Sequence, residues 1–302
     1  MKLTQIKGRT WYLDGYAYIG VYLLDGGRCV LLDSGQRWER EEIAAALAER
    51  GLTVTGILVT HIHTDHAVNN GWFREKTGCL TAAPAGETHL IRDIYSMQGY
   101  LPCMSPGMLR ARFADMVCPV DCPVPPEDGV FQFCGVPFRI VHTPGHSEDH
   151  ICVITPDNVC MVGDAAFGLN DNSKLPYGYC IERMLESTGR LLELDCDWWL
   201  LAHRELREDI APAVEHTRAL ILRRAEEMQA QVTEPMTASE LWEKVSVMYS
   251  LHTDKPINSL LLERNFGLYL HYLEDHGSLK MTAEHGVARY CPPDWEEGAH
   301  EA

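Results

Sequence analysis

The chain has 302 residues, of which 46% are hydrophobic, and its formal net charge at pH 7 is −17. This length supplies enough apolar material for one large domain and a smaller one. The negative charge argues against a nucleic-acid partner, because a phosphate-binding surface is basic.

The N-terminal part predicts a β-hairpin. Its strands are expected at Tyr18–Leu24 and Cys29–Leu32, joined by a turn at Gly26-Gly27. The second strand runs directly into Asp33-Ser34-Gly35, which places a carboxylate at a strand end.

The most informative segment follows the apolar run Ile57-Leu58-Val59. It reads His61-Ile62-His63-Thr64-Asp65-His66, with four potential metal ligands in six residues. Side chains two positions apart in an extended segment point the same way, so His61 and His63 can converge on one ion. Asp65 and His66 come where the chain turns toward a predicted helix at Ala67–Lys76, and they can face a second ion.

The next region, Ile94–Gly129, is rich in Pro, Gly, Met and aromatic residues. It predicts a long loop with one helix at Pro106–Met116. Long structured loops are often functional, and Met and aromatic side chains can line an adaptable pocket. Two interpretations stay open: a lid over the substrate, or a segment that packs over an exposed part of the fold.

Three further candidate ligands each follow an apolar segment that predicts a buried strand. They are His146 in Thr143-Pro144-Gly145-His146-Ser147 after Phe138–Val141, Asp164 after Val159–Val162, and His203 after Trp198–Ala202.

A second loop is expected at Phe167–Cys180. Tyr177 and Tyr179 lie in it, and their hydroxyls are candidate hydrogen-bond donors to an oxyanion that develops on the substrate. The competing interpretation is that each ring anchors a turn.

From about residue 211 the chain predicts a helical module. Helices are expected at Pro212–Val232, at Thr237–Ser250 with Ser239 near its cap, and at Asn258–Asp275, followed by a hairpin at Leu279–Cys291. Three helices and a hairpin suggest a winged-helix-like arrangement. Residues 212–302 hold 8 Lys and Arg against 15 Asp and Glu, a net charge of −7, which disfavours DNA binding. The tail from Asp294 is acidic and is expected to be disordered.

These motifs, in this order, resemble the metallo-β-lactamase-fold hydrolases, and the glyoxalase II-like and lactonase-like branches are most similar in pattern. The resemblance implies an α/β fold, a four-layer αββα sandwich with a small C-terminal, mainly helical, winged-helix-like domain. The domains would be residues 1–210, 211–293 and an acidic tail at 294–302. It also implies that Asp33-Ser34-Gly35 supports the metal loop.

The resemblance implies two divalent metal ions, with zinc as the default and iron or manganese as alternatives. His61, His63 and His146 would hold the first metal, Asp65, His66 and His203 the second, and Asp164 would bridge them. The family usually has a glycine beside the last histidine, and here Ala202-His203-Arg204 departs from that pattern.

The implied activity is hydrolysis of a thioester, lactone or related acyl bond of a small molecule by a metal-bridging hydroxide. Asp65, with a free carboxylate oxygen, would orient the hydroxide and transfer a proton as a general acid–base group. The alternative is a persulfide dioxygenase-like oxidoreductase, with one iron on His61, His146 and Asp164.

The N-terminus, Met1–Gln5, lacks an apolar signal region, and no stretch approaches the ~20 apolar residues of a membrane span. We therefore expect a cytoplasmic enzyme with no membrane or nucleic-acid partner, and a homodimer through the helical module is a candidate assembly. Eleven cysteines, an odd number, favour reduced thiols over a disulfide framework.

Overall fold

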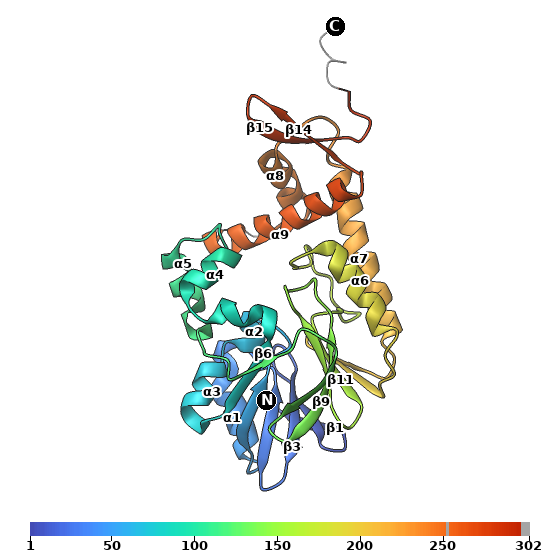
Figure 1. Ribbon diagram of the computed structural model, residues 1–302. Coiled ribbons are helices and arrows are strands. Elements are labelled where there is room, and N and C mark those ends of the chain that lie inside the picture. Colours follow the sequence, from blue (N-terminus) through green and yellow to red (C-terminus); the bar gives the residue numbers. More distant parts are fainter. Residues whose placement is uncertain (252–253, 297–302) are drawn as a thin grey trace. The chain divides into compact units, whose positions relative to one another are not determined.

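The computed structural model describes residues 1–251 and 254–296 (Figure 1). The chain divides into two compact units. Unit 1 contains Met1–Asp171 and Arg183–Thr217, and unit 2 contains Asn172–Glu182 and Arg218–Ala302. The division after Thr217 falls inside helix α7 (Ala211–Gln229), whose first residue is the predicted start of the C-terminal domain. Residues 297–302 of the predicted acidic tail lie outside the described residues.

The first sheet of unit 1 has seven strands in sequence order, so each strand pairs with its chain neighbour. The pairs from β1 to β4 are antiparallel, which confirms the predicted hairpin, and those from β4 to β7 are parallel. The strands are β1 (Leu3–Lys7), β2 (Thr10–Leu13), β3 (Ile19–Leu24), β4 (Arg28–Leu32), β5 (Thr53–Leu58), β6 (Leu80–Pro84) and β7 (Cys122–Val124).

The second sheet has six strands in the order β13-β12-β11-β10-β9-β8. Its pairs are antiparallel except β11 with β12, which run parallel. The strands are β8 (Gly129–Phe133), β9 (Val136–His142), β10 (Ile151–Ile154), β11 (Val159–Gly163), β12 (Trp198–Leu201) and β13 (Glu205–Arg207). The three strands expected before His146, Asp164 and His203 are therefore confirmed as β9, β11 and β12.

The main core of unit 1 lies between the two sheets. Leu58 of the first sheet and Phe133 and Phe138 of the second belong to one buried cluster. A second buried cluster joins Trp199 of β12 to Leu191 of α6 (Ile181–Leu191) and Val214 of α7. Helices α1 (Arg40–Ala48) and α3 (Asn70–Thr77) lie beside the first sheet (Figure 1), and their Ile43, Leu47 and Phe73 are buried. Unit 1 is thus an αββα sandwich.

The predicted helix Ala67–Lys76 is two helices, α2 (Thr64–Ala67) and α3, separated by Val68 and Asn69. The break has a physical cause. The side-chain amide of buried Asn69 donates to the carbonyls of Ser34, Gly35 and Gln36, at 2.7, 3.0 and 2.9 Å. These bonds hold Asn69 against the loop after β4, and the sequence pattern gives no sign of them.

The prediction of a mainly irregular segment at Ile94–Gly129 was wrong. The segment contains α4 (Ile94–Tyr100), α5 (Pro106–Phe113), the 3₁₀ helix η3 (Ala114–Met116) and strand β7. Each α-helix starts at a capping residue that the sequence supplies, because Asp93 accepts from the Ser96 amide and Ser105 from the Met108 amide. The predicted helix Pro106–Met116 corresponds to α5 and η3. A further 3₁₀ helix, η2 (Ala85–Ile91), precedes this segment.

Unit 2 contains the predicted order of helices and hairpin. After its part of α7 come α8 (Ala238–Met248), α9 (Pro256–Asp275), β14 (Lys280–Glu284) and β15 (Val287–Cys291). The cap of α8 is Thr237, the first residue of the predicted helix and two residues before Ser239, and Thr237 forms a reciprocal capping box with Glu240. In the described part of the chain, none of the helices has the length and apolar character that a membrane crossing requires. All eleven cysteines are free thiols, as predicted.

The loop Asn172–Glu182 belongs to unit 2 because α9 holds it. The amide of Gly178 donates to Asn265 Oδ1 at 2.9 Å, and Asn265 Nδ2 donates to the Pro176 carbonyl at 2.7 Å. Asn265 is fully buried, and these hydrogen bonds to the loop supply the partners that its side-chain amide needs there.

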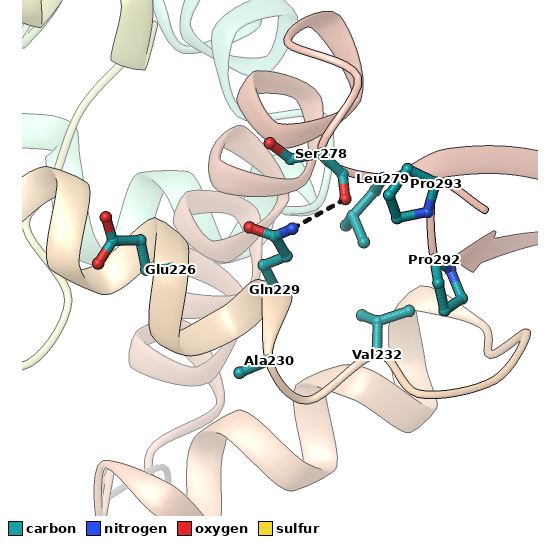
Figure 2. A pocket seen from close by; sticks show the side chains of 8 residues that line it. All are labelled: Glu226, Gln229, Ala230, Val232, Ser278, Leu279, Pro292 and Pro293. Atoms are coloured by element: carbon teal, nitrogen blue, oxygen red, sulfur yellow. Dashed lines mark hydrogen bonds between the residues drawn. The ribbon is translucent and has the colours of Figure 1, made fainter.

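A small pocket in unit 2 is shown in Figure 2. It lies between the end of α7 and the start of β14, where Gln229 Nε2 donates to the Ser278 carbonyl at 3.2 Å. Its lining includes Val232, Leu279 and two prolines, Pro292 and Pro293. None of the predicted site residues lines this pocket.

The two sheets approach each other closely at Gly56 in β5. A Cβ added at Gly56 would lie 2.5 Å from Cys134 Sγ and 2.7 Å from Phe133 Cε1, whereas one added at Gly129 in β8 meets nothing within 4 Å. We expect Gly56→Ala to lower the free energy of unfolding of unit 1 by about 1–3 kcal/mol through overpacking. Urea unfolding of Gly56→Ala and of the control Gly129→Ala tests this expectation, and equal midpoints would contradict it.

Candidate metal centre

The structure brings all seven predicted ligands together in unit 1. They come from the ends of four strands in two sheets, so their proximity depends on the packing of one sheet on the other. Three groups have ligand atoms that all lie within 4.8 Å of one another. These groups are His61 with His63 and His146, Asp65 with His66 and His203, and His61 with His66 and Asp164.

The first group is an imidazole cluster. His61 Nε2 lies 2.9 Å from His63 Nδ1, which lies 2.9 Å from His146 Nε2. His61 and His63 therefore share a face, as their spacing predicts. Three converging imidazole nitrogens are a typical first-row metal site.

The second group mixes a carboxylate with imidazoles. Asp65 Oδ2 lies 3.8 Å from His66 Nε2 and 4.0 Å from His203 Nε2. His66 is fully buried, whereas the side chain of His203 is 32% exposed. This second group therefore faces the surface more than the first.

Asp164 lies between the two groups. Its Oδ2 atom is 3.2 Å from His146 Nε2 and 3.3 Å from His203 Nε2, and its Oδ1 atom is 3.5 Å from His66 Nε2. One carboxylate thus reaches a histidine of the first group and two of the second. This is the position that the predicted bridging role requires.

The donor set fits divalent metal ions. Within the described residues, the buried atoms His66 Nε2 and Asp164 Oδ1 form no hydrogen bond of ordinary length and face each other at 3.5 Å. Buried polar atoms without partners are costly, and a cation would supply the missing interaction. Imidazole with carboxylate suits zinc, iron or manganese, so the donors fit a metal without selecting the ion.

The electrostatics differ between the two groups. Burial, followed by the neighbouring imidazoles, lowers the pKa of His61 well below its usual value, and burial also lowers the pKa of His146. The Asp164 carboxylate raises the pKa of His203 to about 9, against the effect of burial. Metal ligands bind in the deprotonated form, so an ion would compete with the proton on His203 and not on His61.

A buried carboxylate behind the ligands orients them. Asp33 Oδ2 lies 2.8 Å from His66 Nδ1, and its Oδ1 accepts from the Thr60 amide at 2.7 Å. The Thr60 hydroxyl lies 3.1 Å from His61 Nδ1. These contacts occupy the Nδ1 atoms and leave both Nε2 atoms directed at the centre. The supporting role that the resemblance implies for Asp33-Ser34-Gly35 agrees with this geometry.

Sequence reasoning missed two residues that support the centre. Glu87, in η2, is fully buried and accepts from the Ile62 amide at 2.6 Å, the Asp149 amide at 2.8 Å and the Ser147 hydroxyl. It therefore ties the loop of His61 and His63 to the loop of His146. Burial raises the pKa of Glu87 to about 7, although these hydrogen bonds oppose the rise. The sequence did carry a signal for Glu87, because it comes shortly after strand β6, just as each predicted ligand comes shortly after a strand.

The second missed residue is His150, which is fully buried. Its Nδ1 lies 2.8 Å from the Thr143 hydroxyl, and its Nε2 accepts from the Asp164 amide at 3.1 Å. His150 therefore fixes the backbone of the bridging carboxylate and occupies both ring nitrogens in doing so. Its place four residues after His146 gives no sequence signal for this role.

The two predicted tyrosines belong to unit 2. Arg264 of α9 donates to the Tyr177 hydroxyl at 3.4 Å and lies against its ring, with 5.7 Å between the guanidinium carbon and the ring centroid. Tyr179 lies in the same loop. Their action as hydrogen-bond donors to an oxyanion stays a prediction.

We expect Glu87→Gln to weaken metal binding by about tenfold, because an amide cannot accept from all three donors and the two ligand loops lose their common anchor. Competition with a chromophoric chelator measures the effect. Glu148→Gln is the control. Glu148 lies in the loop of His146, but its carboxylate faces the surface residue His89, 3.9 Å away. Unaltered affinity in Glu87→Gln would contradict the anchoring role.

Comparison with known proteins agrees with this site. The family model described as the metallo-beta-lactamase superfamily matches residues 16–203, a range that contains all seven ligand candidates. Among solved structures, a metallo-beta-lactamase family protein from Thermus thermophilus superposes with a TM-score of 0.70 at 24% identity, covering 91% of this chain and 94% of that one. This likeness shows the fold and extends beyond the catalytic sandwich.

Two kinds of curated relative are similar in sequence. An atrochrysone carboxyl ACP thioesterase from Emericella nidulans is 23% identical over 289 residues, 94% of this chain and 80% of that protein. A hydroxyacylglutathione hydrolase from Rhizobium meliloti is 30% identical over 160 residues, 53% of this chain and 51% of that protein. The family match covers more than half of the chain and includes all seven ligand candidates: the chain belongs to the metallo-beta-lactamase superfamily.

Proposed function

We propose that this chain is a binuclear metal-dependent hydrolase that cleaves a thioester, or a lactone or related acyl bond, of a small molecule. The observation that carries the proposal is the pair of ligand groups that share Asp164. The His61, His63 and His146 group alone would suit one ion. The second group, with Asp65, His66 and His203, gives a second ion its own donors.

Two divalent ions at this spacing of donors supply an activated water and a Lewis acid for the substrate carbonyl when they are bound. The protein residues hold the ligand side chains in place and orient them. Asp33 and Thr60 fix the ring planes of His66 and His61, and Glu87 fixes the loops that carry them. Asp65 is more exposed than Asp164, so we assign to it the general acid–base role, in which it passes a proton to the leaving group.

Two features support a thioester as the substrate. The relatives named as ACP thioesterase and as hydroxyacylglutathione hydrolase both act, by their names, on an acyl group held by a thiol. The thioesterase match also covers 94% of this chain, whereas the hydroxyacylglutathione hydrolase match covers about half of it. We therefore propose thioester hydrolysis ahead of lactone hydrolysis.

The remaining predictions become part of the proposal. We propose a cytoplasmic enzyme with a small-molecule substrate and no nucleic-acid or membrane partner, and a homodimer as its assembly. Zinc is the proposed ion, with iron or manganese as alternatives.

Metal content distinguishes the hydrolase from the dioxygenase alternative, in which one iron is held by His61, His146 and Asp164. We expect about two ions per chain in the wild type and about one in His203→Ala, because only the second group loses a donor. Elemental analysis of protein purified without added metal measures both. His89→Ala, at a half-exposed surface histidine, is the control. A single iron that survives His203→Ala would favour the dioxygenase.

The tyrosine hypothesis has a direct test. If the hydroxyl of Tyr177 or Tyr179 stabilises an oxyanion, Tyr→Phe at that position should lower kcat by roughly 100-fold with little change in KM. Steady-state kinetics on an acyl thioester measures the effect, with Tyr272→Phe as the control in the same unit. Wild-type kcat in both variants would reject the hypothesis.

A further inference from the structure

Two exposed aromatic side chains lie beside the second ligand group, within unit 1. Tyr16 is 45% exposed and Trp38 is 67% exposed, and their rings meet edge to face with centroids 5.9 Å apart. The Tyr16 ring also meets the imidazole of His203, with 6.2 Å between the centroids. Single exposed aromatics are ordinary on a surface, but ligand-binding sites are typically lined by aromatic side chains, and this edge-to-face pair contacts a candidate metal ligand.

The segment that carries Tyr16 is held in place by buried groups. The Tyr16 amide donates to Glu39 Oε1 at 2.6 Å, and Glu39 is only 8% exposed. The Tyr18 amide donates to the carbonyl of Ala202, next to His203, at 2.6 Å. The same Glu39 carboxylate accepts from the Gln36 amide at 3.2 Å and caps the 3₁₀ turn Arg37–Glu39, which carries Trp38. The backbone that carries the exposed rings is therefore preorganised, which lowers the entropic cost of binding a ligand there.

Arg204 adds a positive charge beside Tyr16 and Trp38, which together we call the aromatic wall. Its backbone is strained in this position. It has φ +70°, the left-handed conformation that favours glycine and strains other residues. Its Nε donates to the Tyr16 carbonyl at 3.2 Å, and its guanidinium carbon lies 5.8 Å from the Tyr16 ring centroid. The side chain is exposed, so the strained position displays a cation over an aromatic face next to His203.

We propose that Tyr16, Trp38 and Arg204 form a subsite for the acyl part of the substrate, and that it takes a planar group bearing a negative charge, the chemistry of a carboxylated aromatic acyl thioester. The proposal rests on the proposed hydrolase function, since the scissile carbonyl would lie at the metal centre while the ring meets the aromatic wall. Aromatic faces bind a flat ring, and a guanidinium matches a carboxylate with two parallel hydrogen bonds.

Kinetics with three N-acetylcysteamine thioesters tests the subsite on the metal-loaded full chain. The substrates are 3-carboxybenzoyl, benzoyl and butyryl, which differ in charge and in planarity. We expect Arg204→Gly to lower the ratio of kcat/KM for 3-carboxybenzoyl over benzoyl by about fivefold, a typical effect of one partly exposed ion pair. Glycine suits the left-handed backbone, so this variant removes the cation without imposing strain. An equal loss on all three substrates would overturn the charge assignment.

A second variant, Trp38→Ala, tests the aromatic part of the subsite. Trp38→Ala should lower kcat/KM for both aromatic thioesters by about fivefold relative to butyryl, because a stacked ring pair contributes roughly 1 kcal/mol. The control is Arg37→Ala, since Arg37 adjoins Trp38 but is paired with Asp115 at 2.8 Å. An unaltered aromatic-to-butyryl ratio in Trp38→Ala would remove Trp38 from the subsite.

Binding of the free acids separates this proposal from the proposed function. We expect isophthalate to bind the wild type more tightly than benzoate in calorimetric titrations, and Arg204→Gly to abolish the difference. If none of the three thioesters is cleaved but this binding difference is found, the hydrolase assignment fails for these substrates and the subsite stands. Equal affinities for the two acids in the wild type would overturn the subsite, whatever the hydrolytic activity.

Discussion

The hydrogen bonds of the buried Asp33 carboxylate are the interaction on which the metal centre depends. Asp33 is 4% exposed and joins the end of β4 to Thr60 and His66, in the segment that carries four of the seven ligands. Hydrogen bonds to a charged group contribute roughly 1.5–3 kcal/mol each, and here they also set which imidazole nitrogen faces the centre. Without them His66 and, through Thr60, His61 would lose the contacts that orient their rings.

Burying the polar atoms of this centre lowers the stability of the fold. His61, His66 and Asp164 are all buried, and two of their polar atoms form no hydrogen bond of ordinary length within the described residues. The surrounding structure offsets this cost by tying each ligand loop to buried polar groups, with Glu87 between two loops and His150 behind Asp164. A bound cation would complete the arrangement and would then contribute to the stability of unit 1 as well as to its chemistry.

The inner and outer parts of the site have different physical origins. The ligand candidates are buried or partly buried and follow strand ends of the superfamily's fold. Tyr16, Trp38 and Arg204 are exposed and lie in the segments that connect the strands. A shared fold supports many substrates, so we expect exposed groups such as these, and not the ligands, to decide the choice of substrate.

The sequence by itself determined the ligand candidates and most strands, because ligands two residues apart after an apolar run, and motifs such as Thr143–Ser147, are local patterns. It also predicted the order of helices and hairpin in unit 2. Only the tertiary structure decided how the groups meet, that Asn69 breaks a predicted helix, and that Glu87 and His150 support the centre. Arg204 shows the reason. Its sequence position departs from the family pattern, but the left-handed backbone and the contact with Tyr16 arise from contacts across the sandwich that no local pattern encodes.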